Sequence, residues 1–242
     1  MFQHWKNEAS NRKPNILYSV SDRSDFWPVR VRGEALGNPD SDGGLTGSGM
    51  IAGTLVATEM GWMAVQDLRP GDRVVTFDNG MVPLREVRAS RLNTHAGHLP
   101  RAFWPLRLPE RALGNRQEML LLPEQSVLVE SDHAETLYGD PFVLVGAAAL
   151  EGYNGIERVM PGIQLKVLSL RFNEDQVVYA NGMVLLQCSH DEAWIARSPE
   201  DLMELGRNSR YLSLPRAQGK QLIGAMRQAE AGGAPKVSAS GR

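Results

Sequence analysis

Short hydrophobic runs separated by turn residues dominate residues 47–80. Runs at 54–58, 62–65 and 73–77 combine β-branched, aromatic and other apolar residues, as β-strands do. Leu68-Arg69-Pro70-Gly71-Asp72 places Pro and Gly as a type II turn requires, and Asp78-Asn79-Gly80 is a hairpin signal. This segment is therefore predicted to fold as a curled antiparallel meander.

The same texture of short apolar runs continues to residue 187. It predicts further strands at 82–90, 104–108, 119–122, 126–130, 163–172, 176–180 and 183–187. Asn181-Gly182 is expected to join the last two as a type I′ turn, because both residue types tolerate positive φ.

Helical patterns are few and lie mainly towards the C-terminus. Residues 132–138 are predicted to form a short helix capped by Ser131 or Asp132. Ser198 is expected to cap another helix, and residues 218–230 carry apolar side chains on one helical face. The predicted fold class is all-β with short C-terminal helices.

Composition and charge restrict the classes of partner. The 242 residues carry a formal net charge of −2, which gives no electrostatic basis for binding nucleic acid or an anionic membrane surface. The single cysteine excludes an internal disulfide framework, and no apolar stretch approaches the roughly 20 residues of a membrane span. The N-terminus lacks the apolar core of a signal peptide, so a cytoplasmic location is expected, with signal-independent export left open.

Changes in composition and hydrophobic pattern divide the chain into three parts. Residues 1–46 are predicted to be an N-terminal extension and linker, residues 47–190 the β-domain, and residues 191–242 a C-terminal helical segment with a flexible tail.

Three ordered blocks carry a resemblance to a known family. The opening block reads GTLVAT, then GW, then DLRPGDRVVTFDNG; the middle block contains FWPLRLPERALGN and LLLPEQSVL; the closing block reads VVYANGMVLLQC. Together they resemble the Hint domain of hedgehog proteins and inteins, in the short bacterial form found in alphaproteobacteria. The resemblance covers residues 47–190 and implies a horseshoe-like β-fold related to self-cleaving domains.

The resemblance also implies where the upstream chemistry would lie. In active families a Cys, Ser or Thr attacks the preceding carbonyl, which shifts the amide to a thioester or ester. That nucleophile position falls on Gly49, which has no side chain. Ser48 lies one residue out of register, and Thr54 lies within the first predicted strand.

The positions that, in active families, transfer protons and complete the cleavage also carry other residues here. The middle-block histidine falls on Gln125, whose amide cannot take and return a proton near neutral pH. The penultimate histidine falls on Leu186 and the terminal asparagine on Gln187, and the cysteine that follows is retained as Cys188. A lone cysteine in such a strand is more often a small buried hydrophobe than a nucleophile.

Three functions follow from these observations. The favoured one is a Hint domain without self-cleavage that serves a structural or interaction role. The alternative is an autoprocessing domain that cuts its own backbone near Gly49 or Cys188. A hydrolase unrelated to this family is supported only by scattered Ser, Asp and His residues, without a Gly-x-Ser-x-Gly elbow.

The other candidate groups favour ordinary structural roles. His95 and His98 have the spacing for a metal but no further ligand nearby in sequence, and a solvated loop is the favoured interpretation. Ser131, Asp132 and His133 point in different directions at a helix start and cannot form a triad with one another. We therefore expect no cofactor, metal, nucleic acid, membrane or small-molecule substrate, and leave a protein partner open.

Overall fold

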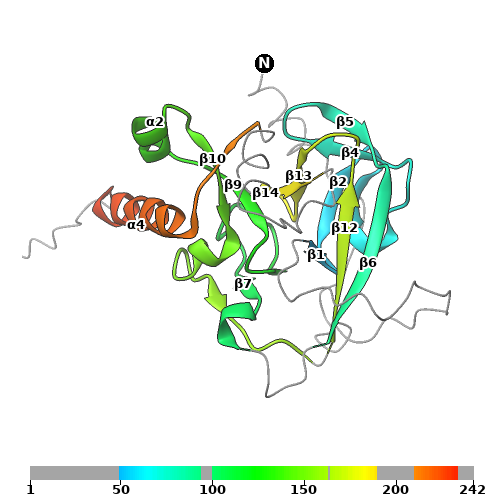
Figure 1. The fold of residues 1–242 in the computed structure, drawn as a ribbon, viewed down its shortest axis with the longest axis horizontal. Helices are drawn as coiled ribbons and strands as arrows, with labels where there is room; N and C mark the ends of the chain where they lie inside the picture. The colour runs from blue at the N-terminus through cyan, green and yellow to red at the C-terminus, as the bar shows by residue number, and fades with distance from the viewer. Residues whose placement is uncertain (1–48, 94–99, 163, 190–209, 234–242) are drawn as a thin grey trace, which may run out of the picture. The chain divides into compact units, whose positions relative to one another are not determined.

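The computed structural model describes residues 49–93, 100–162, 164–189 and 210–233 (Figure 1). Within these ranges the chain forms two β-sheets, two α-helices and short 3-10 turns. None of these helices is long and apolar enough to cross a membrane. Ser48, His95, His98 and the helix predicted at Ser198 lie outside the described residues.

One sheet has six strands in the described part of the chain. Their spatial order is β11 (Glu157–Arg158), β7 (Leu106–Leu108), β8 (Met119–Leu121), β1 (Met50–Ile51), β12 (Gln164–Arg171) and β6 (Glu86–Asn93). Met50 pairs with Leu121 on one side and Leu168 on the other. The two-residue strand β1 is therefore held in the middle of the sheet, and it fixes the position of Gly49 before it.

The other sheet has nine strands among the residues that the structure describes. Its main path is β15 (Leu212–Ser213), β10 (Phe142–Gly146), β9 (Ser126–Glu130), β14 (Val184–Cys188), β13 (Gln176–Ala180), β2 (Leu55–Thr58), β4 (Arg73–Thr76) and β5 (Gly80–Pro83), and β3 (Gly61–Ala64) pairs with β2. The three strands predicted for the opening segment and the final hairpin are present in it, but β2 pairs with both β3 and β4, so the opening strands do not follow the order of the predicted meander. Asn181 and Gly182 have positive φ of 44° and 122°, as expected, but the connection is one residue longer than the predicted type I′ turn, because Ala180 pairs with Val184.

A single main hydrophobic core contains side chains from both sheets. Leu106 and Leu121 enter it from the six-stranded sheet, and Val178 and Leu186 enter it from the nine-stranded one. Because the alternating apolar positions of both sheets are buried together, the two sheets form one packed domain.

The strand predicted over 82–90 was wrong, because the chain changes sheets inside that range. β5 ends at Pro83, which has no N–H to donate, and pairs with β4 in the nine-stranded sheet. Leu84 is buried and its N–H donates to the carbonyl of Asp72 at 2.8 Å. β6 then begins at Glu86 and pairs with β12 in the six-stranded sheet.

The short helix α2 (Asp132–Tyr138) is capped as predicted. The side-chain oxygen of Ser131 accepts a hydrogen bond from the N–H of His133 at 3.2 Å. Gly139 ends the helix with φ of 79°, and its N–H donates to the carbonyl of Glu135. The Ser131 hydroxyl therefore caps the N-terminus of α2.

The C-terminal helix α4 (Arg216–Gly233) includes the predicted range 218–230 and extends beyond it. It packs on the 3-10 helix η3 (Ala147–Leu150) and on β10, with Leu222 and Ile223 in the main core (Figure 1). The domain boundary at residue 190 stays a prediction. Within the described residues, β15 and α4 belong to the same sheet and core as the preceding strands.

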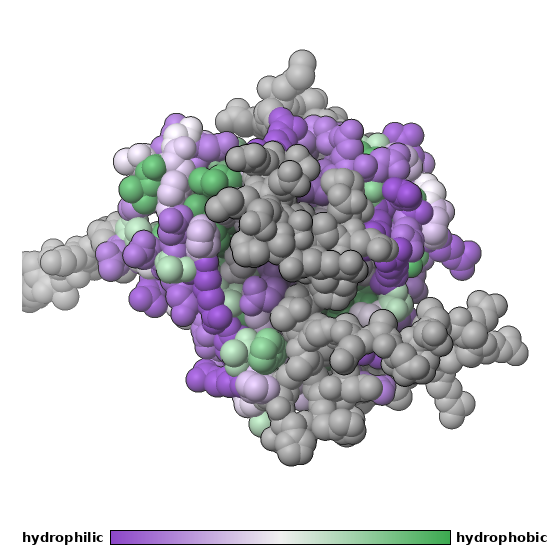
Figure 2. Space-filling view, in the orientation of Figure 1, coloured by the Kyte–Doolittle hydropathy of each residue, from purple (hydrophilic) through white to green (hydrophobic). Residues whose placement is uncertain are grey.

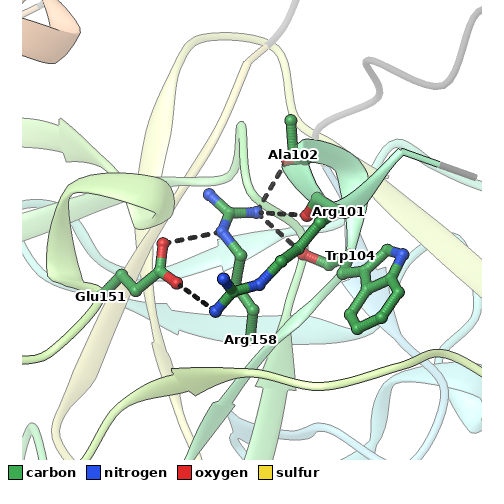
Figure 3. A network of polar contacts seen from close by, with 5 residues as sticks. All are labelled: Arg101, Ala102, Trp104, Glu151 and Arg158. Carbon is green, nitrogen blue, oxygen red and sulfur yellow. Dashed lines mark hydrogen bonds and ion pairs between the residues drawn. The ribbon is translucent and has the colours of Figure 1, made fainter.

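A buried arginine holds the loop before β7. The guanidinium of Arg158 donates to the carbonyls of Ala102 at 2.7 Å, Trp104 at 3.1 Å and Arg101 at 3.4 Å, and to the carboxylate of Glu151 at 2.8 Å (Figure 3). Its side chain is 4% exposed. A planar group with several fixed donors fits this cage of carbonyls, which the point charge of lysine could not serve equally well.

We expect Arg158→Ala to lower the free energy of unfolding by about 2 kcal/mol, because it removes a buried side chain whose four hydrogen bonds hold the loop before β7 to Glu151. Arg73→Ala is the matched control, since Arg73 and Glu59 form an exposed pair, and its expected loss is below about 1 kcal/mol. Urea denaturation measures both. Equal losses would contradict the assignment of Arg158 as the anchor of the loop.

Candidate functional site

Gln125 lies at the corner between β8 and β9. Its N–H donates to the carbonyl of Leu122 at 3.0 Å, which closes a turn through Pro123 and Glu124. The backbone carbonyl of Gln125 accepts from the N–H of Ala147 at 2.9 Å. The residue is 1% exposed, so its amide points into the protein and must find hydrogen-bonding partners there.

The amide of Gln125 connects the two ends of the predicted Hint segment. Its Oε1 accepts the N–H of Gly49 at 2.9 Å, and its Nε2 donates to the carbonyls of Gln187 at 2.9 Å and Ser126 at 3.0 Å. These partners fix the amide's orientation, because turning it over would place NH₂ against N–H and oxygen against two carbonyls. We call this arrangement the Gln125 bridge.

Gly49 occupies a space that leaves no room for a side chain. A Cβ built on it would lie 2.6 Å from Cγ1 of Val167 and 3.2 Å from the carbonyl oxygen of Leu168. Both residues belong to β12, whose pairing with β1 sets this close approach. A nucleophilic side chain at position 49 would therefore require β12 or Val167 to move.

Cys188 ends β14 as a buried free thiol. Burial, with a smaller contribution from the charge of Asp175, raises its pKa from 9.0 to about 12. The thiolate is the nucleophilic form of cysteine, so this environment keeps Cys188 in its unreactive form near neutral pH. The side-chain amide of the preceding Gln187 donates to the carboxylate of Asp175 at 3.5 Å.

Thr54 takes a structural role in the turn between β1 and β2. Its hydroxyl donates to the carbonyl of Ile51 at 2.8 Å, and its own N–H donates to the same carbonyl at 3.1 Å. Its carbonyl accepts from the N–H of Val65 at 2.8 Å. The structure therefore places Thr54 at a backbone turn near Gly49, with its hydroxyl engaged locally.

Of the sequence-predicted positions, Gly49 and Gln187 both contact the side chain of Gln125. Cys188 directly follows Gln187 in β14. Val167 and Asp175 were not predicted as members of the site. Their contribution depends on strand pairing between distant parts of the chain, which local sequence patterns do not encode. Among the described residues, no group of three or more His, Cys, Asp or Glu side chains could hold a metal.

The family of the chain follows from comparison with known proteins. A family model described as Hint domain matches residues 48–185, which is more than half of the chain. The chain belongs to the Hint domain family, and the predicted family and all-β fold class are confirmed. The match begins next to Gly49 and ends in β14, so the Gln125 bridge connects its two ends.

Solved structures of inteins show a distant likeness in fold. The MchDnaB-1 intein (N145AA) is 12% identical, with 57% of this chain and 98% of that chain covered and a TM-score of 0.38. The bacterial intein-like domain from Clostridium thermocellum is 14% identical, with 57% and 97% covered and a TM-score of 0.36. The gp41-1 intein is 13% identical, with 60% and 100% covered and a TM-score of 0.36. Comparison with curated proteins returned no match.

Gln125→Met should lower the free energy of unfolding by roughly 2–4 kcal/mol, because the N–H of Gly49 and the carbonyl of Gln187 lose their buried partner. Gln66→Met is the matched control, since Gln66 accepts from the N–H of Gly53 at an exposed site. Its expected loss is below about 1 kcal/mol. Chemical denaturation compares the pair, and similar losses would argue against a buried bridge.

Alkaline pH should destabilise the domain through Cys188. The folded chain holds the thiol proton more tightly than the unfolded chain does. The contribution of the thiol to the free energy of unfolding is therefore complete below pH 9 and is lost as pH rises towards 12. Tyr153 acts in the same direction, because burial and its hydrogen bond to Glu230 raise its pKa to about 12. The free energy of unfolding should therefore fall less steeply with pH in Cys188→Ala than in the unmodified chain. Identical slopes would show that the thiol is not desolvated in solution.

Proposed function

We propose that this Hint domain does not cut its own backbone and serves as a structural or interaction domain. The observation that carries the proposal is the Gln125 bridge. Its oxygen accepts the N–H of Gly49, the nitrogen that would have to leave if the bond between residues 48 and 49 were cut.

Cleaving that bond requires a nucleophile on residue 49 and a proton delivered to its nitrogen. Gly49 supplies no nucleophile, and Val167 occupies the space where one would start. The Oε1 of Gln125 is only an acceptor, so it holds the hydrogen of the intact peptide and cannot donate one. A missing acid–base group alone removes about 10²–10⁴-fold in rate.

The downstream junction gives equally little support to cleavage. The side-chain amide that would have to cyclise at Gln187 lies against the carboxylate of Asp175, and the carbonyl of Gln187 is held by Gln125. Cys188 is buried with its pKa raised to about 12. These contacts favour the structural interpretation over the autoprocessing alternative.

The described surface favours some kinds of partner over others. Large exposed hydrophobic side chains in the described residues are Met60, Leu137, Met160, Met183 and Leu212, which come from separate elements. On the part of the face that Figure 2 draws in colour, hydrophilic residues predominate and hydrophobic ones form small separate groups. A structural role, or a partner held mainly by polar contacts, fits this surface better than a partner held by a large apolar patch.

The purified chain should keep its full intact mass during prolonged incubation at neutral pH with dithiothreitol. The reason is that, among the described residues, neither junction offers both a reactive nucleophile and a proton donor. Intact mass spectrometry measures this outcome. Fragments with new ends at residue 49 or 188 would overturn the proposal.

A regain-of-function series isolates the contribution of Gln125. Gly49→Cys with Val167→Ala supplies a thiol and the space for it, and Gln125→His then supplies a proton donor. Thiol-induced cleavage before residue 49 should be faster in the triple variant than in the double variant by about 10²-fold or more. If the double variant cleaves as fast as the triple one, Gln125 is not what protects the bond.

A further inference from the structure

Residues 210–233, here called the arm, dock onto the domain beyond the part that the family model matches. β15 pairs in parallel with β10, with Val143 opposite Leu212 and Leu144 opposite Ser213. The N–H of Leu214 then donates to the carbonyl of Leu144 at 2.8 Å. The arm thus covers the edge that β10 would otherwise expose.

Tyr211 ties the start of the arm to a second place on the sheet. Its buried hydroxyl donates to Oδ1 of Asp78 at 2.6 Å, in the turn after β4. Its ring packs near Phe77 and Phe142, with centroids 6.4 Å and 6.5 Å away. These contacts of Tyr211 hold the start of the arm in place on the nine-stranded sheet.

Helix α4 rests on η3 through a small residue. A Cβ built on Gly219 would lie 3.3 Å from Cβ of Ala149 and 3.5 Å from Cγ1 of Val145, so the helix approaches η3 and β10 very closely here. Further along α4, the hydroxyl of Tyr153 donates to Oε1 of Glu230 at 2.5 Å. Gly224 on the same helix has no such neighbour within 4 Å.

The elements beneath the arm hold the corner that carries the Gln125 bridge. The N–H of Ala147 donates to the carbonyl of Gln125 at 2.9 Å, and the N–H of Ala148 donates to the carbonyl of Pro123 at 2.8 Å. Gly146 of β10 pairs with Ser126 of β9, the residue after Gln125. A continuous series of contacts therefore runs from α4 through η3 to the backbone of Gln125.

We propose that the arm is a positioning element for the Gln125 bridge. Its docking fixes η3 and β10, which hold residues 123–125 so that the amide reaches Gly49 and Gln187 together. This proposal deepens the proposed function, since it names what maintains the protected junction. It also stands apart from cleavage, because it concerns the protection of one amide from solvent.

The test compares Gly219→Leu with Gly224→Leu by amide hydrogen exchange in the full chain. Both variants replace a glycine in α4 and raise its helix propensity equally, but only the first forces a side chain against Ala149. Three amides are followed: Leu214 reports arm docking, Gly49 reports the bridge, and Leu84, bonded to Asp72 at the open end of the β4–β5 hairpin, is the reference.

In Gly219→Leu, exchange at Leu214 and Gly49 should rise by about tenfold or more relative to Leu84, while Gly224→Leu leaves all three ratios unchanged. Faster exchange at Leu214 with unchanged Gly49 would overturn the proposal, because the arm would then be loosened without any effect on the bridge. Unchanged exchange at both amides would also overturn it. If leucine unfolds the chain, Gly219→Ala and Gly224→Ala apply the same comparison with a smaller clash.

The two proposals fail in distinguishable ways. An intact mass that stays constant, together with a Gly49 amide insensitive to Gly219→Leu, would retain the proposed function and reject the arm's role. Fragments with new ends at residue 49 or 188 would reject the proposed function, whatever the exchange of Gly49 shows.

Discussion

The buried amide of Gln125 is the constraint on which the arrangement of this domain depends. A buried amide is costly unless its donors and acceptor are satisfied, and here its partners come from the strand entry at Gly49 and from β9 and β14. β1 belongs to one sheet and β14 to the other. One side chain therefore joins the two sheets at the place where the ends of the matched segment meet, and any shift of either sheet would leave a polar group unpaired.

Local sequence patterns predicted much of the fold because its signals are short-range. Alternating apolar residues marked most strands, Asn181-Gly182 marked the last hairpin, and Ser131 marked a helix cap. The break after Pro83 was missed because Leu84 is apolar and continues the pattern, although its N–H bonds to Asp72 rather than to a neighbouring strand. The parallel pairing of β15 with β10 was also missed, since two residues carry no periodicity.

The sequence indicated which residues form the candidate site, but not how crowded Gly49 is or how buried Cys188 is. Ordered motifs placed Gly49, Gln125 and Gln187 at the corresponding points of the family, and the structure brings these three into contact. The crowding of Gly49 by Val167 arises from pairing between β1 and β12, which no local pattern reveals. The high pKa of Cys188 likewise depends on tertiary burial and on Asp175. Residue identity thus located these positions, and packing between distant strands sets the environment of each one.

The contact between Gly49 and Val167 has a consequence for substitutions at these two positions. A single mutation that placed cysteine at position 49 would meet Val167 and lower stability. A smaller residue at position 167 alone would leave a cavity and lower stability as well. The two positions are therefore coupled, and a double variant should be more stable than the sum of the two single changes predicts.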